Sequence, residues 1–195
     1  MDKKELLFKS RTIFCYENIM PRNAEEICQH IQDVNLDTRD KTEEVPLTFT
    51  INSGGGDPFA ARKIAIWLGD IQEFYEKSET SLKPRILVRG CAISAAAILV
   101  AYAKSYKVPV YVEPHTIMKF HDFDIMPQQD WFSRKRLSSL VASYDQFFEE
   151  MLATYHQLMN QKISYESLKR EMEEEKFYLD SDTILARGLA DEIIT

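Results

Sequence analysis

Apolar residues recur with two different periods along this chain of 195 residues. Short apolar runs that end at turn residues predict strands, and apolar residues spaced three and four apart predict helices. Strands are expected at residues 11–15, 47–51, 85–88, 108–112 and 117–120. Helices are expected from residue 23, over 58–75, from about 94, and over 137–160, 165–174 and 182–187. Because strands alternate with helices, the pattern predicts one α/β domain over residues 1–195.

The first predicted helix carries a capping signal. Asn23 is followed by Glu26 three positions later, which is the spacing of a capping box. We therefore expect Asn23 to cap this helix.

The longest helical pattern covers about residues 137–160. Its apolar residues form a wide stripe along one side of the helix. The stripe comprises Leu137, Leu140, Val141, Tyr144, Phe147, Phe148, Met151, Leu152, Tyr155, Leu158 and Met159. Such a stripe either packs on the core of its own domain or contacts a second subunit, and the pattern does not choose between the two.

Charge and cysteine content exclude several classes of protein. With 24 Lys and Arg against 31 Asp and Glu the net charge is −7, whereas a general nucleic-acid surface needs excess positive charge. The longest apolar run, residues 92–103, is far shorter than the ~20 residues that span a bilayer, and the N-terminal residues lack the apolar core of a secretory signal. The three cysteines show no CxxC spacing. We expect no disulfide framework, no metal site, no cofactor and a cytoplasmic location.

Three consecutive glycines follow the strand predicted at 47–51. Gly54, Gly55 and Gly56 are half of the six glycines in the chain. Glycine lets the backbone adopt positive φ and approach a ligand closely, and N–H groups at a strand-to-helix turn can bind an anion or a developing oxyanion. The segment lacks the features of a phosphate loop or a dinucleotide fingerprint. A tight structural turn explains it equally well.

Ser94 stands at the start of a helix of small apolar residues, shortly after Gly90. Its functional interpretation is a nucleophile near the positive end of the helix dipole. Two structural interpretations compete with this one: Ser94 caps the helix, or it is a small residue packed in the core. The segment by itself favours the cap.

Residues 114–121 contain two of the four histidines, His115 and His121. A serine hydroxyl is a poor nucleophile without a base, and histidine is the usual base near neutral pH. Either histidine can serve, and each can equally be an exposed residue of an edge strand. Lys119 shares a face with His121 in an extended strand, so it is an alternative base.

Together the three segments resemble the proteolytic subunit of the Clp protease, ClpP, and the similarity extends from Arg11 to Ile193. The matching segments are residues 11–14, 51–56, 90–95, 114–121 and 188–191. The first glycine-rich segment is similar to the family's INSPGG turn, with Gly54 in place of the proline. The segment around Ser94 is similar to GxAAS(M/A), the histidine segment to P-N-A-R-x-M-I-H, and the last to G-L-(V/I)-D.

The resemblance implies an α/β fold of repeated ββα units, the ClpP/crotonase-like fold, with a long protruding oligomerisation helix at about 137–160. It also implies a Ser-His-acid triad. Ser94 is then the nucleophile and His121 the base, and the N–H groups of Gly55 and Ala95 form the oxyanion hole.

The resemblance leaves the acid of the triad open. The family's aspartate precedes an aromatic residue by two positions. Counting from Phe177 puts Glu175 in its place, whereas counting back from Gly188 puts Lys176 there. We choose Glu175, because glutamate orients the imidazole in other hydrolase triads. The alternatives are Glu173 and Glu174, or a solvated charge run with no catalytic role.

Two further departures from the family concern assembly. Only about ten residues precede Arg11, whereas the family has a segment there that gates the pore and meets an ATPase. The loop over residues 122–131 has no glycine, whereas the family's loop is glycine-rich. These departures put the ATPase contact and the register of ring stacking in question.

The implied function is that of an ATP-dependent-type serine endopeptidase that cleaves unfolded polypeptides. Its implied partners are further copies of itself in a ring, a heptamer or double heptamer, and a Clp-type AAA+ ATPase, with neither nucleic acid nor membrane. The second hypothesis, favoured by the missing aspartate, is a catalytically weak or inactive ClpP-like structural subunit. Two others are an acyl-CoA hydratase or isomerase of the crotonase superfamily and a membrane-type peptidase with Lys119 as base.

Overall fold

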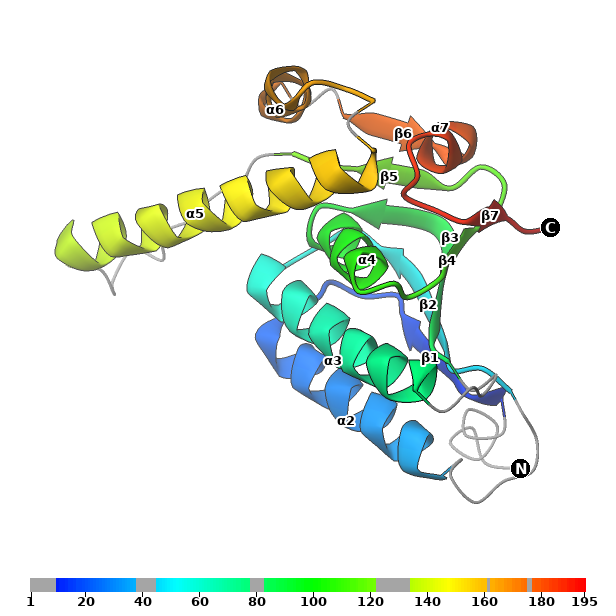
Figure 1. The fold of residues 1–195 in the computed structure, drawn as a ribbon. Helices are drawn as coiled ribbons and strands as arrows, with labels where there is room; N and C mark the ends of the chain where they lie inside the picture. Colours follow the sequence, from blue (N-terminus) through cyan, green and yellow to red (C-terminus); the bar gives the residue numbers. More distant parts are fainter. Residues whose placement is uncertain (1–9, 38–44, 78–82, 122–133, 161, 175–176) are drawn as a thin grey trace.

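The computed structural model describes residues 10–37, 45–77, 83–121, 134–160, 162–174 and 177–195 (Figure 1). Its strands are β1 (Thr12–Cys15), β2 (Thr48–Ser53), β3 (Arg85–Ile93), β4 (Val110–Val112), β5 (Ile117–Lys119), β6 (Tyr178–Asp180) and β7 (Glu192–Ile193). Its helices are α2 (Pro21–Asp37), α3 (Pro58–Glu76), α4 (Ala95–Ser105), α5 (Arg134–Leu158), α6 (Tyr165–Glu173) and α7 (Ser181–Ala186). Strands and helices alternate along the first half of the chain, which confirms the predicted α/β class.

The described strands form one mostly parallel sheet. Its main path runs β1-β2-β3-β4-β7, and each neighbouring pair on this path is parallel. β3 is longer than the predicted strand and serves two neighbours: its residues 86–88 pair with β4, and its residues 91–93 pair in parallel with β5. β5 pairs in turn with β6, antiparallel. The carboxyl end of β3 therefore lies beside the carboxyl end of β5.

Helix α4 lies inside the core. Every residue from Ala95 to Ala103 is buried, because the helix contacts α3, α5 and β3 (Figure 1). The alanines along α4 let these neighbours approach closely, since a side chain of one carbon leaves little volume between the packed elements. Burial on several sides fixes where α4 begins, and with it the position of Ser94.

The apolar stripe of α5 divides along the helix. The helix covers nearly all of the segment predicted at 137–160, which confirms that prediction. Its later residues, among them Phe147, Met151 and Tyr155, are buried on their own domain. Nearer the start of the helix, Val141 is 38% exposed. The first of the two interpretations of the stripe thus holds for the C-terminal part of α5, and contact with a second subunit stays a prediction for the N-terminal part.

The capping prediction for Asn23 is wrong. α2 begins at Pro21, ahead of Asn23, because proline suits the first turn of a helix. The Asn23 Oδ1 accepts the N–H of Met20 at 2.7 Å, and its Nδ2 donates to the carbonyl of Asn18 at 2.6 Å. Asn23 therefore fills the returning half of a capping box, inside the first turn, in place of the cap itself.

Candidate active site

Ser94 lies at the junction between β3 and α4 in a strained backbone conformation. Its φ is 54° and its ψ is −122°, a region that residues with a Cβ rarely adopt and that costs on the order of 1–3 kcal/mol. The backbone of Ser94 is tightly held, because its N–H donates to the carbonyl of Lys119 at 2.8 Å and its own carbonyl accepts the N–H of Ile98 at 3.1 Å. Its side chain makes no capping hydrogen bond. The helix-cap interpretation is therefore wrong.

The glycine turn packs directly against Ser94. Gly55 has a φ of +116°, and a Cβ built on it would lie 2.7 Å from the Ser94 Cβ and 2.8 Å from the carbonyl oxygen of Ile93. Both distances are shorter than real Cβ contacts, so only glycine fits at this position. The same Cβ would lie 3.3 Å from the backbone N of Ala95. The structure thus brings together three of the predicted site residues, Gly55, Ser94 and Ala95.

A second segment holds the glycine turn in place. The Ile19 N–H donates to the carbonyl of Gly55 at 2.7 Å, and the Asp57 N–H donates to the carbonyl of Ile19 at 2.6 Å. A Cβ on Gly56 would lie 2.2 Å from the Ile19 carbonyl oxygen, so this contact also requires glycine. Asp57 then caps α3, because its carboxylate accepts the N–H of Ala60 at 2.7 Å. The turn is therefore fixed by its neighbour on one side and by the start of a helix on the other.

His121 follows the end of β5 on the same edge of the sheet as Ser94. In the parallel β3–β5 pairing Ile93 lies opposite Lys119, so the chain continues to Ser94 on one strand and to Phe120 and His121 on the other. The His121 side chain is half-buried. His115 precedes β5, at the opposite end of that strand from Ser94, and is exposed. Of the two candidate bases among the histidines, the topology favours His121.

The alternative base, Lys119, has an aromatic neighbour. Its Nζ lies over the ring of Tyr178 on β6, 4.8 Å from the ring centroid, a cation–π geometry. The Lys119 group that contacts Ser94 is the backbone carbonyl, which accepts the Ser94 N–H. The Lys119 ammonium thus contacts β6, and the choice between His121 and Lys119 as base stays a prediction.

The chain after α6 runs back along the end of β5. The Phe120 N–H donates to the carbonyl of Phe177 at 3.2 Å, one step beyond the β5–β6 pairing. Glu175, our choice for the acid, and Lys176 lie outside the described residues, as does the loop over 122–131. Glu173 and Glu174 end α6 and are exposed. The acid of the triad therefore stays a prediction.

Two of the three cysteines, Cys15 and Cys28, are poor candidates for a competing nucleophile. Burial raises the pKa of the Cys15 thiol to about 11, and burial likewise raises the pKa of Cys28 to about 11. Both side chains are thus protonated and unreactive near neutral pH. Cys91 is half-buried, and its Sγ donates to Asn52 Oδ1 at 3.3 Å. Within the described ranges, no group of three or more His, Cys, Asp or Glu side chains is arranged to hold a metal ion.

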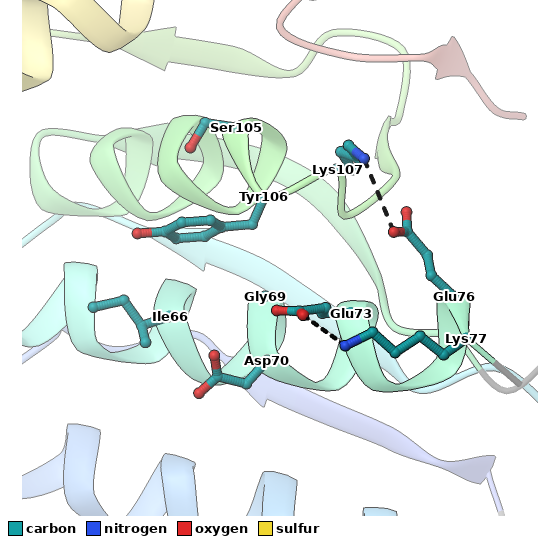
Figure 2. Close-up of a pocket in the computed structure, with 9 residues that line it drawn as sticks. All are labelled: Ile66, Gly69, Asp70, Glu73, Glu76, Lys77, Ser105, Tyr106 and Lys107. Atoms are coloured by element: carbon teal, nitrogen blue, oxygen red, sulfur yellow. Dashed lines mark hydrogen bonds and ion pairs between the residues drawn. The ribbon is translucent and has the colours of Figure 1, made fainter.

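A groove of about 640 Å³ lies between the C-terminal parts of α3 and α4 (Figure 2). Its lining comes from α3 from Ile66 onward, from the end of α4 and from the residues that directly follow each helix. The glycine turn and Ser94, in contrast, precede the N-termini of these helices. Figure 2 shows Gly69 facing Tyr106, with Glu73 paired to Lys77 and Glu76 paired to Lys107. Its carboxylates are largely paired with lysines, and no predicted site residue lines it.

Replacing Gly55 with alanine is expected to lower the kcat of the peptide hydrolysis that the family resemblance implies by at least about 10²-fold, the usual effect of losing an oxyanion donor. The new Cβ would overlap the Ser94 Cβ and must push the turn away from α4. Steady-state hydrolysis of a fluorogenic peptide measures the effect.

Gly54→Ala is the matched control for stability, because its Cβ would meet only Asn18 Oδ1, at 3.7 Å. Denaturant unfolding should show that Gly55→Ala is the less stable variant of the two. Full activity in Gly55→Ala would contradict the close contact between the glycine turn and Ser94.

The fold and this junction define the class of the protein: it is an α/β protein with a strained serine between a strand and a buried helix, beside a turn that only glycine can form. The chain belongs to the Clp protease family, whose model matches residues 1–195. The family assignment confirms the resemblance and agrees with the ClpP-like α/β fold, and it supports a ClpP-like serine peptidase. A comparison with curated proteins gives no match.

Among the described residues, no helix combines the length and the apolar character that crossing a bilayer requires.

Proposed function

We propose that this chain is a serine endopeptidase in which Ser94 is the nucleophile and His121 the general base. The Ser94 Oγ attacks the scissile carbonyl carbon while the imidazole takes its proton. The carbonyl oxygen becomes an oxyanion that accepts hydrogen bonds from the N–H groups of Gly55 and Ala95. Collapse of this intermediate releases the amine with the proton from His121, and water then hydrolyses the acyl-enzyme by the same route.

The observation that carries the proposal is the strained Ser94 in contact with the glycine turn. A backbone held at a φ of 54° without a capping hydrogen bond has no structural benefit for the helix, so the strain indicates a functional constraint. Ala95 is the first residue of α4, and the first N–H groups of a helix have no partner within the helix. A developing negative charge beside Ser94 would thus meet the positive end of the α4 dipole.

The same proposal includes assembly into a ring, a heptamer or double heptamer, that admits unfolded polypeptides. Clp proteases typically form ring oligomers. This chain has exposed apolar side chains for subunit contacts: Phe14 on the edge strand β1 is 45% exposed, Tyr16 directly after β1 is 51% exposed, and Val141 on α5 is 38% exposed. A Clp-type AAA+ ATPase is the proposed partner, and the proposed location is a reducing cytoplasm, in which the free cysteines Cys15, Cys28 and Cys91 stay reduced.

A catalytically weak structural subunit is the second candidate. One observation favours it: the segment that should supply the acid has no aspartate between Glu173 and Phe177. A triad without its aspartate would slow a reaction that the remaining geometry supports.

A fluorophosphonate probe tests the proposal, because it forms a stable covalent bond only with an activated serine. We expect the wild-type oligomer to be labelled at one residue per chain, and tandem mass spectrometry of the labelled peptide to identify that residue as Ser94. Native mass spectrometry of the same sample reports whether the oligomer is intact. An intact oligomer without label on Ser94 would reject the peptidase and support the structural subunit.

A further inference from the structure

The hydroxyl of Ser53 bridges two segments beside the proposed oxyanion hole. Ser53 ends β2 and is 2% exposed. Its Oγ donates to the carbonyl of Glu17 at 2.7 Å and accepts the N–H of Gly55 at 3.2 Å. Because the hydroxyl has one proton and gives it to Glu17, its oxygen faces the Gly55 N–H with its lone pairs. The orientation of the hydroxyl is thereby fixed.

The peptide unit that carries this N–H has little other restraint. It joins Gly54 to Gly55, and neither residue has a Cβ to limit rotation of the peptide plane. A Cβ on Gly54 would meet only Asn18 Oδ1, at 3.7 Å, so that side of the turn is open. The next peptide unit is fixed differently, because the carbonyl of Gly55 accepts the N–H of Ile19. The Ser53 hydroxyl is thus the contact that holds the Gly54–Gly55 peptide by its N–H.

A purely structural role for Ser53 does not account for its hydrogen bond with the Gly55 N–H. The segment around Ile19 is already tied to the turn by two short backbone hydrogen bonds, Ile19 to Gly55 and Asp57 to Ile19. Joining Glu17 to β2 through Ser53 adds a third connection between the same two segments. The contact of Ser53 that no backbone bond duplicates is the one to the Gly55 N–H.

We propose that Ser53 is a positioning residue for the peptidase reaction, and that its hydroxyl orients the Gly54–Gly55 peptide so that the Gly55 N–H is ready for the oxyanion. The inference rests on the proposed function of Ser94. The bond from Gly55 to Ser53 is at the long end of the N–H···O range, and its acceptor is neutral. An oxyanion is a stronger acceptor, so it takes over the N–H as the tetrahedral intermediate forms.

A double-mutant cycle tests this role, with Ser53→Ala, Gly54→Pro and the two combined. Proline at position 54 fixes φ, and its ring also narrows ψ, the angle that sets the plane of the Gly54–Gly55 peptide, so it replaces part of the missing restraint. Gly54 does not have a positive φ that would forbid proline. In the native background we expect Ser53→Ala to lower kcat about 5- to 10-fold, the effect of losing one hydrogen bond, with KM changed less than about twofold. In the Gly54→Pro background the loss of kcat should fall to about twofold or less. Equal losses in both backgrounds would overturn the proposal.

A second measurement keeps the proposal testable if Gly54→Pro does not fold. A peptide boronic acid forms a tetrahedral adduct with the serine, whereas a peptide amide of the same sequence binds without one. Ser53→Ala should weaken boronate inhibition by the same factor as it lowers kcat, and leave inhibition by the amide unchanged. Equal weakening of both inhibitors would assign Ser53 a structural role and overturn the proposal.

The matched control is Ser181→Ala. Ser181 is 8% exposed, and its Oγ accepts the N–H of His115 at 3.0 Å. The variant therefore removes the same kind of hydrogen bond away from the site, and its kcat should stay at the wild-type value.

The fluorophosphonate experiment distinguishes a failure of the proposed role of Ser53 from a failure of the proposed peptidase. A wild-type protein labelled on Ser94 together with an unchanged kcat in Ser53→Ala would reject only the role of Ser53. An unlabelled wild-type oligomer would reject the peptidase, and the role of Ser53 with it.

Discussion

Replacing Ser94 with alanine is expected to abolish peptide hydrolysis, with kcat/KM lower by about 10⁴-fold or more. The reason is the loss of the only proposed nucleophile while the glycine turn and α4 remain in place. The substitution removes a single oxygen that makes no capping hydrogen bond, so the folded structure should persist. Hydrolysis of a fluorogenic peptide measures the loss of activity, and denaturant unfolding of the same preparation measures whether the fold persists.

The Ser94→Gly variant separates the effect of the hydroxyl on catalysis from the effect of backbone strain on stability. Ser94→Gly also lacks the hydroxyl and should be equally inactive. Because glycine adopts a φ of 54° and a ψ of −122° without the Cβ penalty, Ser94→Gly should exceed Ser94→Ala in free energy of unfolding by about 1 kcal/mol. Residual activity above a hundredth of wild type in either variant would contradict Ser94 as nucleophile. A less stable Ser94→Gly would contradict the strain.

Replacing His121 with alanine is expected to lower kcat/KM by about 10⁴-fold, because a serine hydroxyl without a base is almost entirely protonated and weakly nucleophilic. Lys119→Ala should cost less than about tenfold. That variant loses the contact of the ammonium group with the Tyr178 ring, but it keeps the backbone carbonyl that accepts the Ser94 N–H. The rate of fluorophosphonate labelling at Ser94 and the rate of peptide hydrolysis measure both variants.

His115→Ala is the matched control for His121→Ala, since it removes an imidazole from the opposite end of β5. It should retain the wild-type rate. If Lys119→Ala abolished labelling while His121→Ala did not, the base would be Lys119, and the reaction would be that of a Ser-Lys peptidase. Loss of labelling in His115→Ala would contradict the assignment made from the topology of β5.

The elements that the sequence predicts best are those with a long or strongly apolar pattern. The helices α3 and α5 and the strand β2 extend over nearly the predicted residues, because each buries one face or both along many consecutive residues. The strands β6 and β7 are not predicted. Each has two or three residues, and each is a strand only because it pairs with β5 or β4, which lie far away along the chain.

Two errors concern helix caps, and their physical origins differ. The Asn23 cap is wrong because proline at position 21 starts the helix earlier, so that the Asn23 side chain accepts the N–H of Met20 from inside the first turn. The Ser94 cap is wrong because the pairing of β3 with β5 holds the Ser94 backbone in a conformation from which its side chain makes no capping bond to α4. The first error lies within the local sequence, whereas in the second a neighbouring strand overrode a local preference.

The sequence by itself determined the α/β class, the family resemblance and the identity of the residues at the candidate site, because these depend on residue types and spacings within short segments. Only the tertiary structure decided that Gly55 lies against Ser94, that His121 and not His115 follows the strand beside it, and that the Ser53 hydroxyl holds the Gly55 N–H. Gly55 and Ser94, like Ser94 and His121, are tens of positions apart, and no local pattern specifies a distance between them. The Ser53 bond to Gly55 spans two positions, but its direction depends on Glu17, whose carbonyl takes the Ser53 proton from 36 positions away. These arrangements arise because β3 pairs with β2 on one side and with β4 and then β5 on the other, which brings the ends of separate segments to one edge of the sheet.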